Sequence, residues 1–149
     1  MKKILLIVAV FMLTLTACAD HHQMIKYSEL PVQAQSFIQK YFAPSDVSYI
    51  ERERDGFHYE YNVYLTNKTE IDFDQQGNLQ LIDCQNLQVP DGIVPESIVN
   101  YVQLQHPSHF IVEYEIEYRY QKVELNAGGL ELVFDREGHI VGIDDESYF

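Results

Sequence analysis

Two stretches of the chain carry apolar residues at the spacing of an amphipathic helix. One begins after Pro31 and the other after Pro95, 64 residues later. Proline suits the first position of a helix, because the N–H that it lacks would have no partner there. The stretches end near Pro44 and Pro107. Their i, i+3, i+4, i+7 positions are Ala34, Phe37, Ile38 and Tyr41, and then Ile98, Tyr101, Val102 and Gln105.

Each predicted helix is followed by segments in which apolar and polar residues alternate, which is typical of a strand with one buried face. The first alternation, Phe57–Leu65, follows Asp55-Gly56, a pair that favours a hairpin turn. The second alternation, Val112–Arg119, has no such pair before it. Each half continues with an acidic-apolar strand and a last strand, at 70–74 and 79–84 in the first half and at 131–135 and 140–143 in the second.

Two turns of the same form join these last strands. Asp74–Gly77 and Asp135–Gly138 each carry Asp at the first position and Gly three residues later, as in a type I turn that closes a hairpin. We expect both glycines to adopt positive φ, where a Cβ would be strained. Strands joined by short turns pair antiparallel. The chain is therefore predicted to be α+β, with a helix and about four strands repeated at about 28–84 and 92–145.

The N-terminus has the pattern of a secretory signal. Two lysines precede the apolar run Ile4–Leu15, which is too short to span a bilayer because a spanning helix needs ~20 residues. Leu15–Cys18 resembles the bacterial lipobox, which implies cleavage before Cys18 and acylation of its thiol. A plain secreted protein is the alternative, since Ala17-Cys18-Ala19 also fits a signal-peptidase site. The predicted organisation is a signal peptide at 1–17, a lipid-anchored polar tether at 18–27 and a folded domain at 28–149.

Composition and charge narrow the class of protein. The chain has 149 residues, of which 46% are hydrophobic and 22% charged, as in one globular domain or two small repeats. Its formal charge is −13, and cleavage before Cys18 would leave 8 basic against 23 acidic residues, a charge of −15. We expect no nucleic-acid partner, because phosphate contacts are made largely by Lys and Arg. An anionic lipid surface would repel the domain, so membrane attachment must come from the lipid on Cys18.

Side chains that could bind a metal or act as a nucleophile are few. His106 and His109 are separated by Pro107, which breaks the helix that would present both, and His21-His22 lie in the predicted tether. Cys84 stands among apolar residues, which favours a small buried side chain over a nucleophile. The motifs of serine hydrolases, phosphate-binding loops and zinc peptidases are absent. We therefore predict no catalytic residue, no metal site, no cofactor and no enzyme.

One segment partly imitates a calcium loop. Asp72–Gly77 has oxygen-bearing side chains at alternate positions, with Asp83 at the twelfth position, where such loops use a bidentate Glu. The corresponding turn Asp135–Gly138 lacks the ligand set. A hairpin turn explains both segments, whereas calcium explains one, and we favour the turn.

The tyrosines are the remaining candidates for function. The chain has 11 of them and no tryptophan. Tyr64 has opposite parity to Tyr61, so in a strand the two side chains face opposite ways. Tyrosine is favoured at interfaces, because it gives rigid amphipathic area at low entropic cost, but it also suits half-buried sheet positions. The candidate interface residues are Tyr59, Tyr61, Tyr64, Tyr114 and Tyr118.

Helix starts, turns and core positions together match the pattern of a known family. In the first half these residues are Leu30-Pro31, Phe37-Ile38, Tyr41-Phe42, Pro44, Tyr61–Leu65, Ile71–Asp74 and Gly77, and in the second half Val94-Pro95, Ile98, Tyr101, Val102, Pro107, Val123–Leu125, Leu132–Asp135 and Gly138. From Ser28 to about Ile143 the chain resembles the PepSY-like domain of secreted proteins of Gram-negative gut-type bacteria, described as β-lactamase-inhibitor-like. The resemblance implies a tandem duplication of a helix-plus-four-strand unit, with the helices packed on one face of a shared antiparallel sheet. The second half departs from the pattern at Gln105-His106.

Two functional hypotheses follow. In the first, the lipid on Cys18 holds a non-enzymatic module at the cell envelope, facing the periplasm or the cell surface; a soluble periplasmic or secreted protein is the alternative. The resemblance implies that the module engages a protein partner through its exposed sheet face, with inhibition of that partner as one form. The charge of −15 predicts a basic partner surface. In the second, surface carboxylates bind a small molecule or a cation. Contiguous exposed tyrosines would favour the first hypothesis, and a carboxylate-lined cavity the second.

Overall fold

The protein is described by a computed structural model that covers residues 22–126 and 128–145. The predicted signal segment and Cys18 lie outside the described residues. In the described part, nine strands form one sheet in the order of the chain, and all neighbouring pairs are antiparallel, which confirms the α+β class. The elements are β1 (Gln23–Met24), η1 (Tyr27–Glu29), α2 (Val32–Tyr41), η2 (Pro44–Asp46), β2 (Val47–Asp55), β3 (His58–Leu65), β4 (Glu70–Phe73), β5 (Leu79–Asp83), α3 (Glu96–Gln105), β6 (Ile111–Ile116), β7 (Tyr120–Leu125), β8 (Leu130–Asp135) and β9 (Ile140–Asp145).

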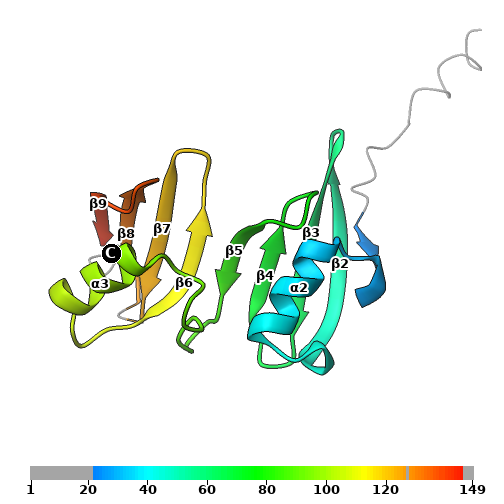
Figure 1. Cartoon of the computed structure of the whole chain (residues 1–149), viewed down its shortest axis with the longest axis horizontal. Coiled ribbons are helices and arrows are strands. Elements are labelled where there is room, and N and C mark those ends of the chain that lie inside the picture. Colours follow the sequence, from blue (N-terminus) through cyan, green and yellow to red (C-terminus); the bar gives the residue numbers. More distant parts are fainter. Residues whose placement is uncertain (1–21, 127, 146–149) are drawn as a thin grey trace, which may run out of the picture.

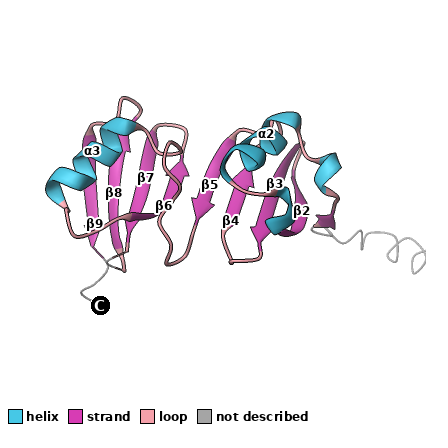
Figure 2. Ribbon diagram, turned by 60° about the horizontal axis from the view of Figure 1, so that its bottom comes forward, coloured by secondary structure: helices cyan, strands magenta, loops and turns pink. Residues whose placement is uncertain are grey.

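Both α-helices lie on the same face of the sheet (Figure 1 and Figure 2). The chain forms two units in sequence order, α2 with β2–β5 and α3 with β6–β9. The units share one sheet because β5 pairs with β6 through Leu81–Asp83 and Glu113–Glu115. The opposite face of the sheet has no helix on it in the described residues, and we call it the open face. None of the described helices combines the length and the apolar character needed to cross a membrane.

The two helices begin as the prolines predict. Pro31 and Pro95 are the N-cap residues, with nearly identical backbone angles (φ −53°, ψ 144° and φ −54°, ψ 140°). Each helix runs for ten residues. The residues that the helices bury against the sheet are Ala34 and Ile38 in α2 and Ile98 and Val102 in α3.

The core lies between the helices and the sheet. Phe73 and Phe134 have no exposed surface, as their strand positions predicted. Phe57 and Tyr118, which the alternation patterns included, are 91% and 88% exposed. The prediction is wrong for these two residues because they lie in the turns that join β2 to β3 and β6 to β7, outside the strands.

The two acidic turns have the same geometry. Gly77 and Gly138 adopt φ of +86° and +85°, which confirms the expected positive φ. Asp74 Oδ1 accepts hydrogen bonds from the backbone N–H groups of the residues two and four positions later, at 2.9 and 2.8 Å. Asp135 Oδ1 does the same at 3.0 and 2.8 Å. These aspartates therefore hold the hairpin turns closed.

Two local features differ from the sequence interpretation. Gln23–Met24, in the predicted tether, form β1 and pair with Glu51–Arg52 of β2, so the chain joins the sheet before residue 28. The hairpin between β6 and β7 forms without an Asp-Gly pair. Its strands are joined by a hydrogen bond from the Glu117 N–H to the Tyr120 carbonyl, at 2.9 Å.

Candidate functional site: the open face of the sheet

Six acidic residues stand in line across the open face, one on each strand from β4 to β9. Each lies directly opposite the next in the strand register. Residues paired in this way have their Cβ atoms ~5 Å apart. The members of this carboxylate row are Glu70, Asp83, Glu113, Glu124, Glu131 and Asp144.

Two stacked tyrosines continue the carboxylate row at its β4 end. Glu70 pairs with Tyr64 of β3, and Tyr64 pairs with Tyr49 of β2. The rings of Tyr49 and Tyr64 are 4.4 Å apart between centroids, with 18° between their planes. Burial and the neighbouring Glu70 carboxylate raise the pKa of the Tyr64 hydroxyl. One end of the open face thus offers an aromatic surface beside the carboxylates.

A second line of paired residues runs alongside the first. Among its described strand positions Lys122 is the one basic residue. Its Nζ lies 2.6 Å from Glu117 Oε1 and 3.6 Å from Glu115 Oε2, and these carboxylates raise the pKa of Lys122. The full line is Glu51, Asn62, Asp72, Leu81, Glu115, Lys122, Val133 and Gly142.

On the open face, Asp72, Glu113 and Glu131 hold their protons more tightly than free carboxyl groups do. Burial raises the pKa of Glu113 to about 7, and the charges of Asp83 and Glu124 add to the effect. Burial also raises the pKa of Asp72 to about 7, with a smaller contribution from Glu70. One oxygen of Asp72, Oδ1, is buried and has no hydrogen-bond partner among the described residues. Like charges directly opposite one another destabilise a sheet, so this face carries a cost in stability.

The arrangement is suited to binding several cationic groups along a line. Each carboxylate can accept charge-assisted hydrogen bonds from lysine or arginine, which are stronger than neutral ones. A cationic partner would replace the repulsion within the row by attraction. Among the described residues, no group of three or more His, Cys, Asp or Glu side chains is arranged to hold a metal ion. Side chains of one row stand roughly perpendicular to the sheet and side by side.

The structure divides the five candidate tyrosines. Tyr64 lies on the open face, and Tyr118 lies exposed at the β6–β7 turn. Tyr61 and Tyr114 are only 8% and 3% exposed, so their assignment to an interface is wrong. Their strand positions point toward the helices, where Tyr114 donates a 2.5 Å hydrogen bond to Gln121. Tyr59 is also on the helix side, half-buried, with the Arg52 guanidinium 5.1 Å from its ring centre.

The residues considered for other chemistry have structural roles or stand apart. Cys84 is 2% exposed and lies in the core, as predicted, and burial raises the pKa of its thiol. Both carboxylate oxygens of Asp74 accept hydrogen bonds within its own turn, so the calcium-like segment forms the predicted hairpin turn. The rings of His106 and His109 are 6.3 Å apart between centroids.

Sequence reasoning missed the carboxylate row and Tyr49. The alternating acidic positions Glu113 and Glu115 of β6, with Glu117 just after it, were visible in the sequence. That alternation shows that they share a face. It does not show which residues of the neighbouring strands lie opposite them.

The chain is similar to known proteins in sequence and in structure. A family described as "Putative beta-lactamase-inhibitor-like, PepSY-like" matches residues 59–141. A crystal structure of a "putative periplasmic protein from DUF2874 family" of Bacteroides vulgatus has 31% sequence identity and a TM-score of 0.78, and the match covers 85% of this chain and 98% of that one. A "putative calcium-regulated periplasmic protein" of Bacteroides thetaiotaomicron has 31% identity and a TM-score of 0.78, with 83% of this chain and 96% of that one covered.

A second Bacteroides vulgatus structure, of a "putative periplasmic protein of unknown function", again has 31% identity and a TM-score of 0.78, over 85% of this chain and 100% of that one. No curated protein matches the chain. The periplasmic description of these neighbours supports an exported location. The family match spans more than half of the chain and agrees with the fold. The chain belongs to the PepSY-like, β-lactamase-inhibitor-like family.

Proposed function

We propose that this chain is a non-enzymatic binding module of the cell envelope that engages a basic surface of a partner protein through the open face. The observation that carries the proposal is the carboxylate row, which begins beside the stacked pair Tyr49 and Tyr64 and continues over six adjacent strands. Such a surface combines rigid aromatic area with several acceptors for charged donors.

The energetics of the carboxylates on the open face support this role. The raised pKa values of Asp72 and Glu113 express the cost of holding these carboxylates charged. Lysine or arginine side chains from a partner would remove part of that cost, because an opposite charge within ~4–6 Å favours the charged form of a carboxylate. The free energy that the charged carboxylates cost the free module would then be partly recovered on binding, and would add to the affinity.

The aromatic pair sets where the partner binds. Tyr49 is 40% exposed and stacks on Tyr64, so its ring is held in place before a partner arrives. A fixed aromatic side chain loses little rotational freedom on binding. The family description supports a protein, including an enzyme, as the partner. Binding over the active site of that enzyme would make the module an inhibitor.

The envelope location rests on two observations. The structural neighbours are described as periplasmic, and Leu15–Cys18 resembles a lipobox. A lipid on Cys18 would hold the module at a membrane while its acidic domain stays clear of anionic lipid. Tandem duplication of the unit is part of the same proposal. It is supported by the matching N-caps at Pro31 and Pro95 and by the matching turns that end in Gly77 and Gly138.

The experiment that tests the proposal compares two variants of equal charge. In the first, Glu113, Glu124 and Glu131 of the row are each changed to Gln. In the matched control, three exposed acidic residues outside the strands are neutralised, as Glu29→Gln, Asp46→Asn and Glu137→Gln. Partners are captured from envelope extract on each protein, and binding of the captured partner is then measured with purified components at two salt concentrations.

We expect the row variant to lose its partner and the control to keep it, with binding that weakens as salt is added. The row variant should also unfold at a higher temperature than the unmodified chain, because opposed like charges have been removed. Loss of binding therefore cannot be attributed to unfolding. Equal binding by both variants, or equal loss in both, would refute a role for the open face.

Calcium binding is the second candidate. It is favoured by the description of the Bacteroides thetaiotaomicron neighbour as calcium-regulated. A cation that binds the native state raises the unfolding temperature in a saturable way. A saturable rise with calcium that magnesium does not reproduce, and that Glu113→Gln abolishes, would replace the first proposal by this one.

A further inference from the structure

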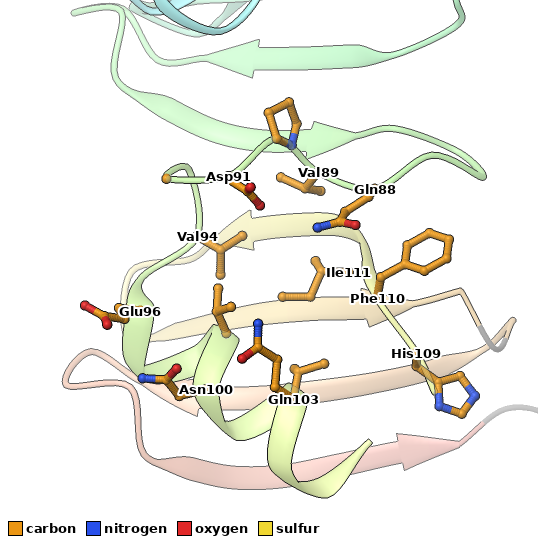
Figure 3. Close-up of a pocket in the computed structure, with 14 residues that line it drawn as sticks. Gln88, Val89, Asp91, Val94, Glu96, Asn100, Gln103, His109, Phe110 and Ile111 are labelled. Atoms are coloured by element: carbon orange, nitrogen blue, oxygen red, sulfur yellow. The ribbon is translucent and has the colours of Figure 1, made fainter. Parts of the chain in front are cut away.

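A cavity of about 630 Å³ opens on the helix side of the second unit, away from the open face (Figure 3). It lies between α3, the linker that leads into α3 and the start of β6. Val89, Val94 and Ile111 form its apolar centre, and Asn100 and Gln103 reach it from α3. Apolar and polar side chains border the cavity in similar measure, and a pocket of this size with polar groups around an apolar centre can hold a ligand.

α3 presents a stripe of side chains to this cavity. Glu96, Val99, Asn100 and Gln103 line it, and they follow the i, i+3, i+4, i+7 spacing of one helix face. Ile98 and Val102 cover the sheet, and Val102 borders the cavity as well. The cavity therefore lies where the side of α3 meets the edge of the core, and core residues such as Val102 and Ile111 form part of its wall.

The first unit contains a matching segment before its own helix. The Glu29 N–H donates to the Lys26 carbonyl at 2.9 Å, and 64 residues later the Ile93 N–H donates to the Pro90 carbonyl at 3.4 Å. The N-cap prolines of α2 and α3 are separated by the same 64 residues. The segments 26–31 and 90–95 therefore correspond residue by residue.

This correspondence shows what the first unit places beside its helix. Tyr27 is partly buried against the core, and its hydroxyl donates a 3.0 Å hydrogen bond to the Gln35 carbonyl of α2. The corresponding residues of the second unit are Asp91 and Val99, and both line the cavity. Asp91 is short and exposed, so it does not replace the ring. A tyrosine ring lies beside α2, whereas the matching place beside α3 is open.

Charge and hydrogen bonding define the occupant further. The carboxylates of Asp91 and Glu96 border the cavity, and the chain as a whole is strongly acidic. His109 also lines it, with a buried Nδ1 that has no hydrogen-bond partner among the described residues. An aromatic group with a hydroxyl, flanked by positive charge, satisfies all three features.

We propose that this cavity is a second binding site, which receives a tyrosine side chain from a basic segment of a partner protein. The apolar centre accommodates the ring, α3 and His109 offer partners to the hydroxyl, and Asp91 and Glu96 attract the flanking cationic residues. Because the cavity lies on the helix side, it can be occupied independently of the open face.

The test uses two peptides and two variants of the whole chain. The probes are acetyl-Lys-Tyr-Lys-amide and acetyl-Lys-Ala-Lys-amide, titrated while backbone amide NMR signals are followed. In Asp91→Tyr the chain itself places a tyrosine ring in the cavity, as Tyr27 places one beside α2 in the first unit. Asp91→Asn removes the same charge and leaves the cavity open, so it is the matched control.

We expect the tyrosine peptide to bind about tenfold more tightly than the alanine peptide, in line with burial of one aromatic side chain. Its signal changes should centre on Val99, Gln103 and Ile111. Asp91→Tyr should abolish this preference and unfold at a higher temperature, whereas Asp91→Asn should keep it. Equal affinity for the two peptides would overturn the proposal, as would signal changes confined to Glu113 and Glu124.

A second copy of the chain is the other possible source of the ring, since Tyr118 is exposed and precedes Arg119. Self-association that increases with protein concentration and is abolished both by Tyr118→Ala and by Asp91→Tyr would assign the cavity to that copy and overturn the proposed partner. A monomer that shows the tyrosine preference supports it.

Discussion

The ring of Tyr101 on α3 meets the ring of Phe134 on β8 edge to face, with 5.4 Å between the centroids and 84° between the planes. Phe37 on α2 and Phe73 on β4 make the same contact at 5.5 Å and 77°. Such pairs contribute ~0.5–1.5 kcal/mol beyond the burial of their surface. Each helix is thus fixed to its own part of the sheet by one aromatic pair.

Truncation of the strand member of either pair should destabilise the fold strongly. Phe73→Ala and Phe134→Ala are each expected to lower the free energy of unfolding by ~3–5 kcal/mol, because both rings are fully buried. Phe57→Ala, at a position that is 91% exposed, is the control and should change it by less than ~0.5 kcal/mol. Denaturant unfolding measures all three, and a small loss for Phe73 or Phe134 would contradict the packing described.

Gly77 should not tolerate a side chain. A Cβ there would lie 2.8 Å from both the Ala34 backbone nitrogen and the Pro31 Cβ, and φ is +86°. Gly77→Ala should therefore cost ~1–2 kcal/mol for the left-handed backbone and a further ~1–3 kcal/mol for overpacking. Gly56→Ala is the matched control, since Gly56 has φ +58° and nothing within 4 Å, and it should show the first cost alone. If Gly77→Ala and Gly56→Ala lower the unfolding temperature equally, the start of α2 moves away from the added Cβ.

The stability of the fold should rise as the pH falls from about 8 to about 5. Burial raises the pKa of Asp72 from 3.8 and of Glu113 from 4.5 to about 7 in the folded state. The folded chain therefore binds protons at a pH where the unfolded chain does not, and protonation stabilises it down to the unfolded pKa values. Below about pH 4 the effect reverses, because the His139 backbone N–H lowers the pKa of Asp135.

Chemical denaturation between pH 4 and pH 8 measures this dependence. Asp72→Asn should reduce the slope of stability against pH, whereas Asp91→Asn, at an exposed turn position, should leave it unchanged. Stability that falls steadily from pH 8 to pH 5 would show that the carboxylates of the open face are not destabilised when charged.

The lipid anchor predicts where a variant is found in the cell. Cys18→Ser removes the thiol that would be acylated, so the protein should move from the membrane fraction to a soluble fraction. Acyl chains provide the stable anchoring to the membrane. Their loss should therefore release the protein. Unchanged membrane fractionation, or a mature N-terminus at Asp20, would exclude the lipoprotein assignment.

The helices and turns could be predicted because short-range chemistry determines them. Pro31 sets the start of α2, and Asp74 and Gly77 set their turn within four residues. The buried parity of Phe73 follows from alternation within a single strand. The same rule, applied to Tyr61 and Tyr114, would have removed them from the candidate interface.

The carboxylate row could not be predicted because it depends on register between strands. Asp83 and Glu113 meet only because β5 pairs with β6 across a linker that contains α3. A register shift between Ile111 and Glu113 moves the following residues of β6 by one place relative to β7. A slip of one residue in a sheet sends a side chain to the other face. The row therefore forms only when all of its strands are paired in the correct register.

The short ladder between β5 and β6 divides the protein into two halves that need not open together. It consists of Leu81–Asp83 against Glu113–Glu115, extended by the Cys84 and Val89 amides and bridged on the helix side by the hydrogen bond from Tyr41 to Gly92. Cooperative unfolding units often coincide with supersecondary motifs. Transient separation along this ladder would pull Asp83 away from Glu113 and break the row between its second and third members. The carboxylate row is thus continuous only while β5 and β6 hold the two halves together.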